Sequence, residues 1–292
     1  SYATYIKHRL NGFDGDSPRR TPKDLEEYPA FSKRASSSGG VPTYSRPQCV
    51  GPISVKDLKP LEVDLQNFKD ALSVSEATDA FMNAASPGVI AQFQPNQHYP
   101  DHSSYLYALA DAMKVEYEGI AEAGLVIQID SPDLALGRHV LFKDQSDEEF
   151  VAMAELHIEA LNHALQNIPA EQLRLHVCWG NYQGPHHCDI EMKKILPAVL
   201  KAKPMALSFE GANPRHSHEW SVFRDAKIPE NKVLIPGVLD STTNFVEHPE
   251  LVAERICRFA DIVGRERVIA GSDCGFSTFA GFGTVDADIT YA

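Results

Sequence analysis

Several apolar stretches of this 292-residue chain end in side chains that can bind a metal ion. One run ends in His176 and Cys178, a second in Glu210 and a third in Cys274. His176 and Cys178 are two residues apart, so on an extended strand both side chains point to the same face. The four residues offer one imidazole, two thiolates and one carboxylate, which matches the four-fold coordination of zinc. Two thiolates favour zinc over magnesium or calcium because they are soft ligands.

Each of these residues also has an ordinary structural explanation. A single His-x-Cys pair is weak evidence for a metal, because a buried cysteine usually behaves as a small apolar side chain. A carboxylate at a strand end often caps the following helix. Four such groups on one predicted face make a shared zinc ion about as plausible as separate structural roles. The spacing leaves both interpretations open, because the residues lie far apart in the sequence.

If the zinc exists, its mixed ligand set favours catalysis over a structural role. The thiolates would hold the metal, and the harder carboxylate of Glu210 would be the ligand most readily exchanged for a substrate thiol. A structural zinc site is usually closed, buried and made from closely spaced ligands. A barrel with a purely structural zinc, acting as a binding protein, is the non-enzymatic alternative.

Other polar residues near the strand ends are candidates for substrate binding. Asp130 ends a further apolar run, and Arg215 follows Glu210 in a segment that we expect at the mouth of the site. Arg215 could bind an anionic substrate group or form a structural ion pair, and the sequence does not separate these roles. Residues 186–188, His-His-Cys, follow Gly-Pro and are expected in a surface or substrate-facing loop.

Alternating strands and helices are predicted to position these residues. The expected strands span residues 49–55, 88–93, 125–130, 173–178, 206–210, 233–239 and 268–272, and the expected helices span 57–73, 104–123, 147–167, 190–202 and 249–263. This alternation predicts a parallel sheet covered by helices, either a barrel or an open sheet. No Gly-x-Gly-x-x-Gly follows a strand, so dinucleotide binding has no support. In a barrel, the carboxyl ends of the strands share the face that carries active sites.

The composition indicates a soluble globular protein with one large α/β unit. Residues 1–47 are rich in Pro and Ser and are expected to form an irregular excursion or arm, with the zinc-binding barrel over 48–292. A net charge of −13 argues against nucleic acid and anionic membranes as partners. Five cysteines, with no signal peptide at the start, predict a reducing compartment, and we expect the cytoplasm. The first segment could also serve as an arm in a homo-oligomer.

The chain resembles the cobalamin-independent methionine synthase family, in particular its carboxyl-terminal catalytic barrel and the single-domain relatives of that barrel. The matching stretches occur in the family's order, cover roughly residues 80–280, and are Ile-Gln-Ile-Asp-Ser-Pro at 127–132, His-Val-Cys at 176–178, Ser-Phe-Glu at 208–210, Pro-Gly-Val-Leu-Asp at 236–240 and Asp-Cys-Gly at 273–275. Taken jointly, these motifs are specific for the family.

The resemblance implies a (β/α)8 TIM-type barrel whose zinc is held by His176, Cys178, Glu210 and Cys274. It also implies a zinc-dependent methyltransferase like the enzyme that uses 5-methyltetrahydropteroyltriglutamate and homocysteine to form methionine. The zinc would hold the substrate thiol as a thiolate, which is the nucleophilic form. Asp130 matches the carboxylate that contacts the homocysteine amino group. The partners would be a small-molecule thiol and an alkyl donor.

Departures from the family pattern limit what the resemblance implies. The Gly-Ser strand and the Asp-Gly-Glu strand that open the family's barrel are not visible, so we expect either a complete barrel or one without its first strands in this chain. Asp240 is expected to line the pocket as a catalytic residue. Two residues later, Thr242 stands where the methionine synthases have a histidine that helps protonate the folate leaving group. Threonine is no comparable acid near neutral pH.

Thiol activation is therefore a firmer expectation than methylfolate as the donor. The same barrel serves relatives that add a thiol to an epoxide, and this reaction is an alternative. A metal-free decarboxylase of the uroporphyrinogen type is another, although two cysteines aligned with a histidine and a glutamate argue against it.

Overall fold

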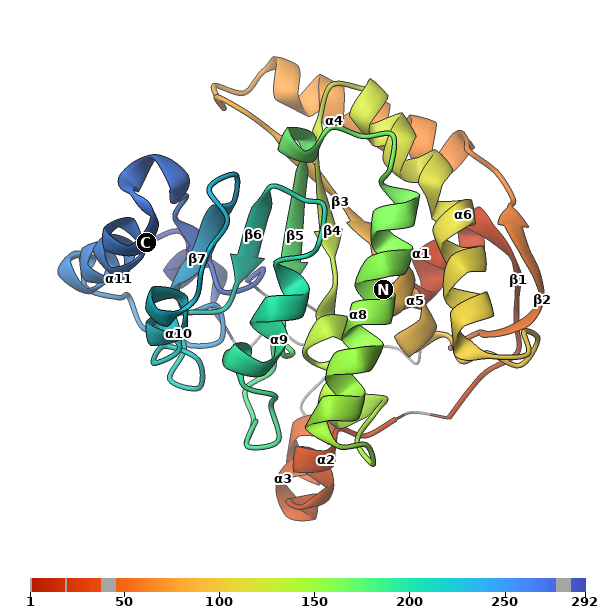
Figure 1. The fold of residues 1–292 in the computed structure, drawn as a ribbon, viewed down its shortest axis with the longest axis horizontal. Coiled ribbons are helices and arrows are strands. Elements are labelled where there is room, and N and C mark those ends of the chain that lie inside the picture. The colour runs from red at the N-terminus through yellow and green to blue at the C-terminus, as the bar shows by residue number, and fades with distance from the viewer. Residues whose placement is uncertain (1, 19, 38–45, 277–284) are drawn as a thin grey trace.

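The computed structural model describes residues 2–18, 20–37, 46–276 and 285–292. Six strands form one parallel sheet in the order β3-β4-β5-β6-β7-β8. Their bounds are Phe81–Ala85, Val126–Asp130, Leu173–Val177, Ala206–Phe209, Val233–Leu239 and Gly271–Ser272. The sheet is curled and is covered by helices (Figure 1). The predicted α/β barrel is thus confirmed as a half-barrel of six strands in the described residues.

Long helices pack against one side of this sheet and cover its apolar surface (Figure 1). They are α6 (His102–Glu122), α8 (Asp147–Ala164), α9 (Met192–Val199) and α11 (Pro249–Val263), and shorter helices are α7 (Gly137–Val140), α10 (Trp220–Asp225) and α12 (Ala287–Thr290). Helix α8 begins with a capping box formed by Ser146 and Glu149. Helix α11 begins at Pro249 and ends before Gly264, whose φ of 88° suits a residue without Cβ. None of the described helices is long and apolar enough to cross a membrane.

One predicted strand is wrong, because residues 88–93 belong to helix α5 (Pro87–Phe93). The side chain of Ser86 accepts a hydrogen bond from the N–H of Val89, and Pro87 occupies the first helical turn. The strand that precedes this helix is β3, which ends at Ala85, two residues before α5 begins. The remaining strands of the parallel sheet lie within or close to the ranges expected from the sequence.

The described residues before position 47 contain more regular structure than the sequence suggested. They form α1 (Tyr2–Arg9), β1 (Leu10–Asp14), α2 (Lys23–Glu26) and α3 (Pro29–Ser37). Strand β1 pairs in antiparallel fashion with β2 (Gln48–Val55), and helix α4 (Lys59–Ser73) leads from β2 to β3. The expected strand at 49–55 therefore exists, but it lies outside the parallel sheet. The division of the chain near residue 47 and the arm remain predictions.

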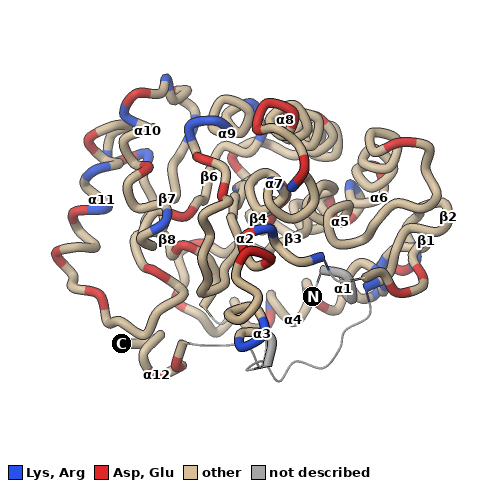
Figure 2. The backbone as a smooth tube through the Cα atoms, turned by 90° about the horizontal axis from the view of Figure 1, so that it is seen from below, with Lys and Arg blue, Asp and Glu red and all other residues tan. Residues whose placement is uncertain are grey.

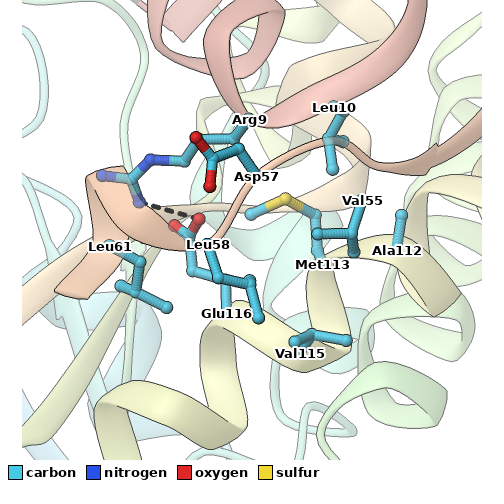
Figure 3. A pocket seen from close by; sticks show the side chains of 10 residues that line it. All are labelled: Arg9, Leu10, Val55, Asp57, Leu58, Leu61, Ala112, Met113, Val115 and Glu116. Atoms are coloured by element: carbon cyan, nitrogen blue, oxygen red, sulfur yellow. Dashed lines mark ion pairs between the residues drawn. The ribbon is translucent and has the colours of Figure 1, made fainter.

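A buried ion pair attaches these N-terminal elements to the outer helix layer. In Figure 3, Arg9 points toward Glu116 of α6, and their Nη1 and Oε2 atoms are 2.8 Å apart. Burial raises the pKa of Glu116 to about 8 and lowers the pKa of Arg9. Leu61 and Met113 line the small hollow around the pair. The N-terminal segment is thus packed against the outside of the half-barrel.

Candidate metal centre and substrate pocket

Strand register brings the predicted site residues to one end of the sheet. Asp130, the last residue of β4, lies opposite His176 in β5, and His176 lies opposite Ser208 in β6. Cys178 and Glu210 directly follow β5 and β6, and Cys274 comes two residues after β8. The carboxyl ends of parallel strands share one edge, so all four predicted ligands lie at the mouth of the half-barrel.

Three of the four predicted ligands meet there. The Sγ atoms of Cys178 and Cys274 are 3.1 Å apart, and the Sγ of Cys274 is 3.3 Å from Nε2 of His176. Two strands separate β5 from β8, and in a flat sheet they would lie about 14 Å apart. The curl of the sheet therefore creates this cluster, which we call the cysteine site and define as His176, Cys178 and Cys274.

The cysteine site favours a thiolate. Hydrogen bonds from Cys274 and His176 lower the pKa of Cys178, and the N–H of Gly180 also donates to its sulfur at 3.2 Å. The same interaction with Cys178, together with burial, raises the pKa of Cys274. Burial opposes the charged form of His176, but the contact with Cys178 and the charges of Asp130 and Glu210 together raise the pKa of His176. These contacts thus favour the thiolate form on Cys178 over Cys274.

The donor atoms of the cysteine site fit a zinc ion. Two thiolates and an imidazole are ligands that zinc prefers, and tetrahedral bonds of about 2.3 Å would separate the two sulfurs by about 3.8 Å. The observed 3.1 Å requires only a small movement apart. The second nitrogen of His176, Nδ1, lies 3.3 Å from the Ser208 hydroxyl, which orients the imidazole ring as outer partners of metal-binding histidines do.

Glu210, the fourth predicted ligand, is bound to other groups in this structure. Its Oε1 accepts a hydrogen bond from the N–H of Trp179 at 2.8 Å. Its Oε2 accepts from the Asn213 amide at 2.8 Å and pairs with Nη2 of Arg215 at 2.6 Å. Burial, followed by the charge of Cys178, raises the pKa of Glu210 to about 8. Glu210 is therefore next to the cysteine site but turned toward Arg215.

Arg215 forms the structural ion pair that the sequence offered as one of two roles. Besides Glu210, it lies 4.0 Å from a carboxylate oxygen of Asp189 and donates from Nε to the Asn213 side chain at 3.1 Å. Its side chain is 16% exposed, so part of it still faces the mouth. The second role, in which Arg215 binds an anionic group of the substrate, remains a prediction.

Asp273 organises the mouth, and sequence reasoning gave it no role. Its Oδ1 accepts hydrogen bonds from the N–H groups of Gly211 and Ala212 at 2.7 and 2.8 Å. Its Oδ2 accepts from the N–H and the amide of Asn213 at 2.8 and 2.7 Å. Burial raises the pKa of Asp273 in spite of these bonds. Asp273 thus connects the segment after β6 to the chain after β8, directly before Cys274. The only sequence signal for this role of Asp273 was its position next to Cys274, a predicted ligand.

Asp130 and Asp240, the other predicted site residues, flank the cysteine site on different strands. The two oxygens of Asp130 accept hydrogen bonds from Gln128 at 2.8 Å and from Asn83 at 3.2 Å. Oδ1 of Asp240 accepts from the N–H and hydroxyl of Thr242 at 2.8 and 2.7 Å. Asp240 also lines a hollow of about 320 Å³ at the ends of β6 and β7, together with Ala212, Pro214, Ser217, Thr243, Phe245, Glu247 and Arg255.

Comparison with known proteins gives consistent matches. Residues 55–287 match the family described as the catalytic domain of the cobalamin-independent synthase. A methionine synthase of Saccharolobus solfataricus is 28% identical over 241 residues, which are 81% of this chain and 62% of the relative. One of Sulfurisphaera tokodaii is 25% identical over 241 residues, again 81% of this chain and 60% of the relative. The chain thus spans less than two thirds of the length of these curated relatives.

A solved structure supports the same fold. The B12-independent methionine synthase from Shewanella sp. W3-18-1, in complex with selenomethionine, superimposes with a TM-score of 0.68. The match covers 99% of this chain and 74% of the other, with 18% sequence identity. At that identity the likeness concerns the fold.

Proposed function

This chain belongs to the family of cobalamin-independent synthase catalytic domains, and on that premise we propose that it is a zinc-dependent transferase that alkylates a substrate thiol. Methyl transfer from a methylated folate to homocysteine, giving methionine, is the reaction we favour. The observation that carries the proposal is the meeting of His176, Cys178 and Cys274 at the mouth of the half-barrel. The related Shewanella enzyme was solved with selenomethionine, the selenium analogue of that product.

In this proposal His176, Cys178, Cys274 and Glu210 would hold the zinc. When bound, the ion would keep a substrate thiol in its nucleophilic thiolate form near neutral pH. Arg215 and Asn213 hold the Glu210 carboxylate beside the cysteine site, and Arg215 offsets its negative charge. Two anionic sulfurs and a carboxylate are otherwise costly to bury together.

The substrate roles follow from position at the mouth. Asp130, across from His176, would bind the amino group of the thiol substrate through its carboxylate. The hollow beside Asp240 would take the alkyl donor. Thr242 donates its hydroxyl hydrogen to Asp240 and so fixes that carboxylate. Because Thr242 supplies no acid for a folate leaving group, a donor such as an epoxide is the alternative to test.

Metal analysis together with a thiol screen tests this function. Purified protein is expected to carry stoichiometric zinc in the cysteine site, and to consume homocysteine when given methylfolate or an epoxide. Cys274→Ser removes one thiolate and is expected to lower thiol consumption by about a hundredfold or more. The matched control is Cys257→Ser, because Cys257 is an exposed cysteine on α11 away from the mouth.

Two results would overturn the proposal. One is wild-type protein that binds no zinc when the ion is supplied. The other is a folded Cys274→Ser variant that alkylates thiols as fast as the wild type. Consumption of thiol with the epoxide alone would keep the transferase and replace the donor.

A further inference from the structure

A second group of metal-binding side chains lies at the mouth, outside the cysteine site. Ligand atoms of Asp24, His186 and Asp189 lie within 4.8 Å of one another. Nδ1 of His139 lies 3.3 Å from Oδ1 of Asp189. We call these four residues the strap site, because Asp24 belongs to α2, which reaches the mouth from the N-terminal segment. The others come from α7 and from the segment between β5 and α9.

Two side chains of the strap site are fully buried and have polar atoms without hydrogen-bond partners. His139 is 0% exposed; its Nε2 has no hydrogen-bond partner, and its Nδ1 has only the 3.3 Å contact with Asp189, which is not aligned as a hydrogen bond. Asp24 is also 0% exposed; its Oδ2 accepts a hydrogen bond from Tyr182, but its Oδ1 has no partner. Buried polar atoms are nearly always satisfied in folded proteins. The unpartnered atoms of both residues therefore indicate a ligand at this place.

The orientation of His186 points to a cation. Its Nε2 lies 3.0 Å from the carbonyl oxygen of Tyr182, which can only accept a hydrogen bond, so Nε2 carries a hydrogen. Its Nδ1 faces both carboxylate oxygens of Asp189 at 3.0 and 3.2 Å. With Nδ1 toward a carboxylate, the ring carries either a second proton, as an imidazolium, or a metal ion bound at Nδ1 in place of that proton. Metal-binding histidines are oriented in this way, by a hydrogen bond from the other nitrogen.

We propose that Asp24, His139, His186 and Asp189 bind a divalent transition-metal ion, separate from the one at the cysteine site. Two imidazoles and two carboxylates suit zinc, manganese, iron or cobalt in the divalent state, and lack the thiolates of the first site. Asp24, His186 and Asp189 would form the centre of the site, and the ion would also satisfy one ring nitrogen of His139, which reaches the group through its contact with Asp189.

Such an ion would fasten α2 to the mouth. Figure 2 shows α2 beside α7, in front of the sheet. Helix α2 also packs on α3 and accepts the hydrogen bond from Tyr182 through Asp24, and two surface ion pairs, Lys143–Glu26 and His187–Glu27, hold it and the residue after it. Surface ion pairs contribute little to stability. Because Asp189 also lies 4.0 Å from Arg215, the position of the strap site is linked to the pair that orients Glu210.

Cobalt(II) is the probe that distinguishes the two sites. Cys178→Ser/Cys274→Ser removes both thiolates, and this protein is expected to bind one equivalent of Co²⁺ without sulfur-to-cobalt charge-transfer bands. Adding Asp24→Asn or His139→Phe is expected to lower the remaining affinity by about tenfold or more. The control is His187→Ala, which disrupts the exposed group Glu27, His187 and Cys188 and should leave that equivalent bound.

Trypsin provides a readout that does not depend on activity. Co²⁺ is expected to protect the chain from cleavage after Lys23 in the thiolate-free protein, and not in its Asp24→Asn derivative. The proposal is overturned if the folded thiolate-free protein binds no Co²⁺, or if both Asp24→Asn and His139→Phe bind it unchanged. Either result would show that the cluster is a metal-free hydrogen-bond network that includes protonated histidines and water. Should His139→Phe fail to fold, the nearly isosteric Asp24→Asn carries the same test.

Discussion

The buried carboxylate of Glu210 is paired with a cation from the segment that follows β6. In this structure its side chain is 1% exposed and is neutralised by Arg215, which the sequence could not pair with it. The interval of five residues fits neither strand nor helix periodicity, and the pair depends on how the segment after β6 turns. At the scale of single residues, the meeting of His176, Cys178 and Cys274 was therefore predictable, and the partners of Glu210 were not.

Arg215→Met tests whether this pair is the main role of Arg215. In metal-free protein, removing the guanidinium leaves a buried carboxylate without a cation, and the free energy of unfolding is expected to fall by about 3–5 kcal/mol. The double variant Glu210→Gln/Arg215→Met should recover most of that loss, because no buried charge is left. Urea unfolding of the two single variants and the double variant measures the coupling. Additive effects, or a loss below about 0.5 kcal/mol for Arg215→Met, would assign Arg215 to the substrate alone.

At the scale of elements, periodicity predicted the amphipathic helices and failed where both faces are buried. Leu106, Leu109, Met113 and Tyr117 recur at three- and four-residue steps and are fully buried in α6. Residues 87–92 of α5 are buried all round, so their apolar run has no period and resembles a strand. The period of two placed His176 and Cys178 on one face, whereas the Asp273 contacts use backbone N–H groups, which leave no trace in the sequence.

The closest approach of β7 to the residues after β8 depends on Gly237. A Cβ there would lie 2.7 Å from Cα and 2.9 Å from Cγ of Asp273, and the Cα cannot yield without moving the chain. Gly237→Ala is expected to destabilise the fold by about 3 kcal/mol and to weaken metal binding at the cysteine site, because Cys274 follows Asp273. Thermal unfolding and a zinc titration measure both effects. The control is Gly275→Ala, since nothing lies within 4 Å of a Cβ at that position. Equal effects of the two substitutions would contradict this role for Gly237.

At the scale of the whole molecule, a buried chain of polar groups connects the helix layer to the sheet. Asp133 follows β4 and accepts a hydrogen bond from Ser86 at 2.7 Å. Its other oxygen lies 2.8 Å from Nδ1 of His157 in α8, whose Nε2 is 2.8 Å from Nε2 of His102 in α6. These contacts join α6 and α8 to the segment that follows β4. The homo-oligomer and the cytoplasmic location remain predictions, because they concern properties beyond this single chain.

His102 makes the stability of the molecule sensitive to acid. Burial, and then the neighbouring His157, lower the pKa of His102 from 6.5 to about 4. Between these values the unfolded chain binds a proton that the folded chain does not, so the free energy of unfolding falls as the pH falls from 6.5 toward 4. One proton accounts for a slope of at most about 1.4 kcal/mol per pH unit. His102→Gln keeps a hydrogen-bonding group toward His157 but does not titrate, and its slope should be smaller by up to that amount.

Urea unfolding at a series of pH values measures this difference. Between pH 7 and 8 His102 is neutral in both states, so wild type and His102→Gln should change in parallel there, which is the internal control. Parallel behaviour between pH 6.5 and 4 as well would show that His102 binds its proton equally in the folded and unfolded chains. That outcome would require water to reach the interface between α6 and α8. The divergence is expected because a proton on His102 would face His157, whose ring is the group that contacts the buried carboxylate of Asp133.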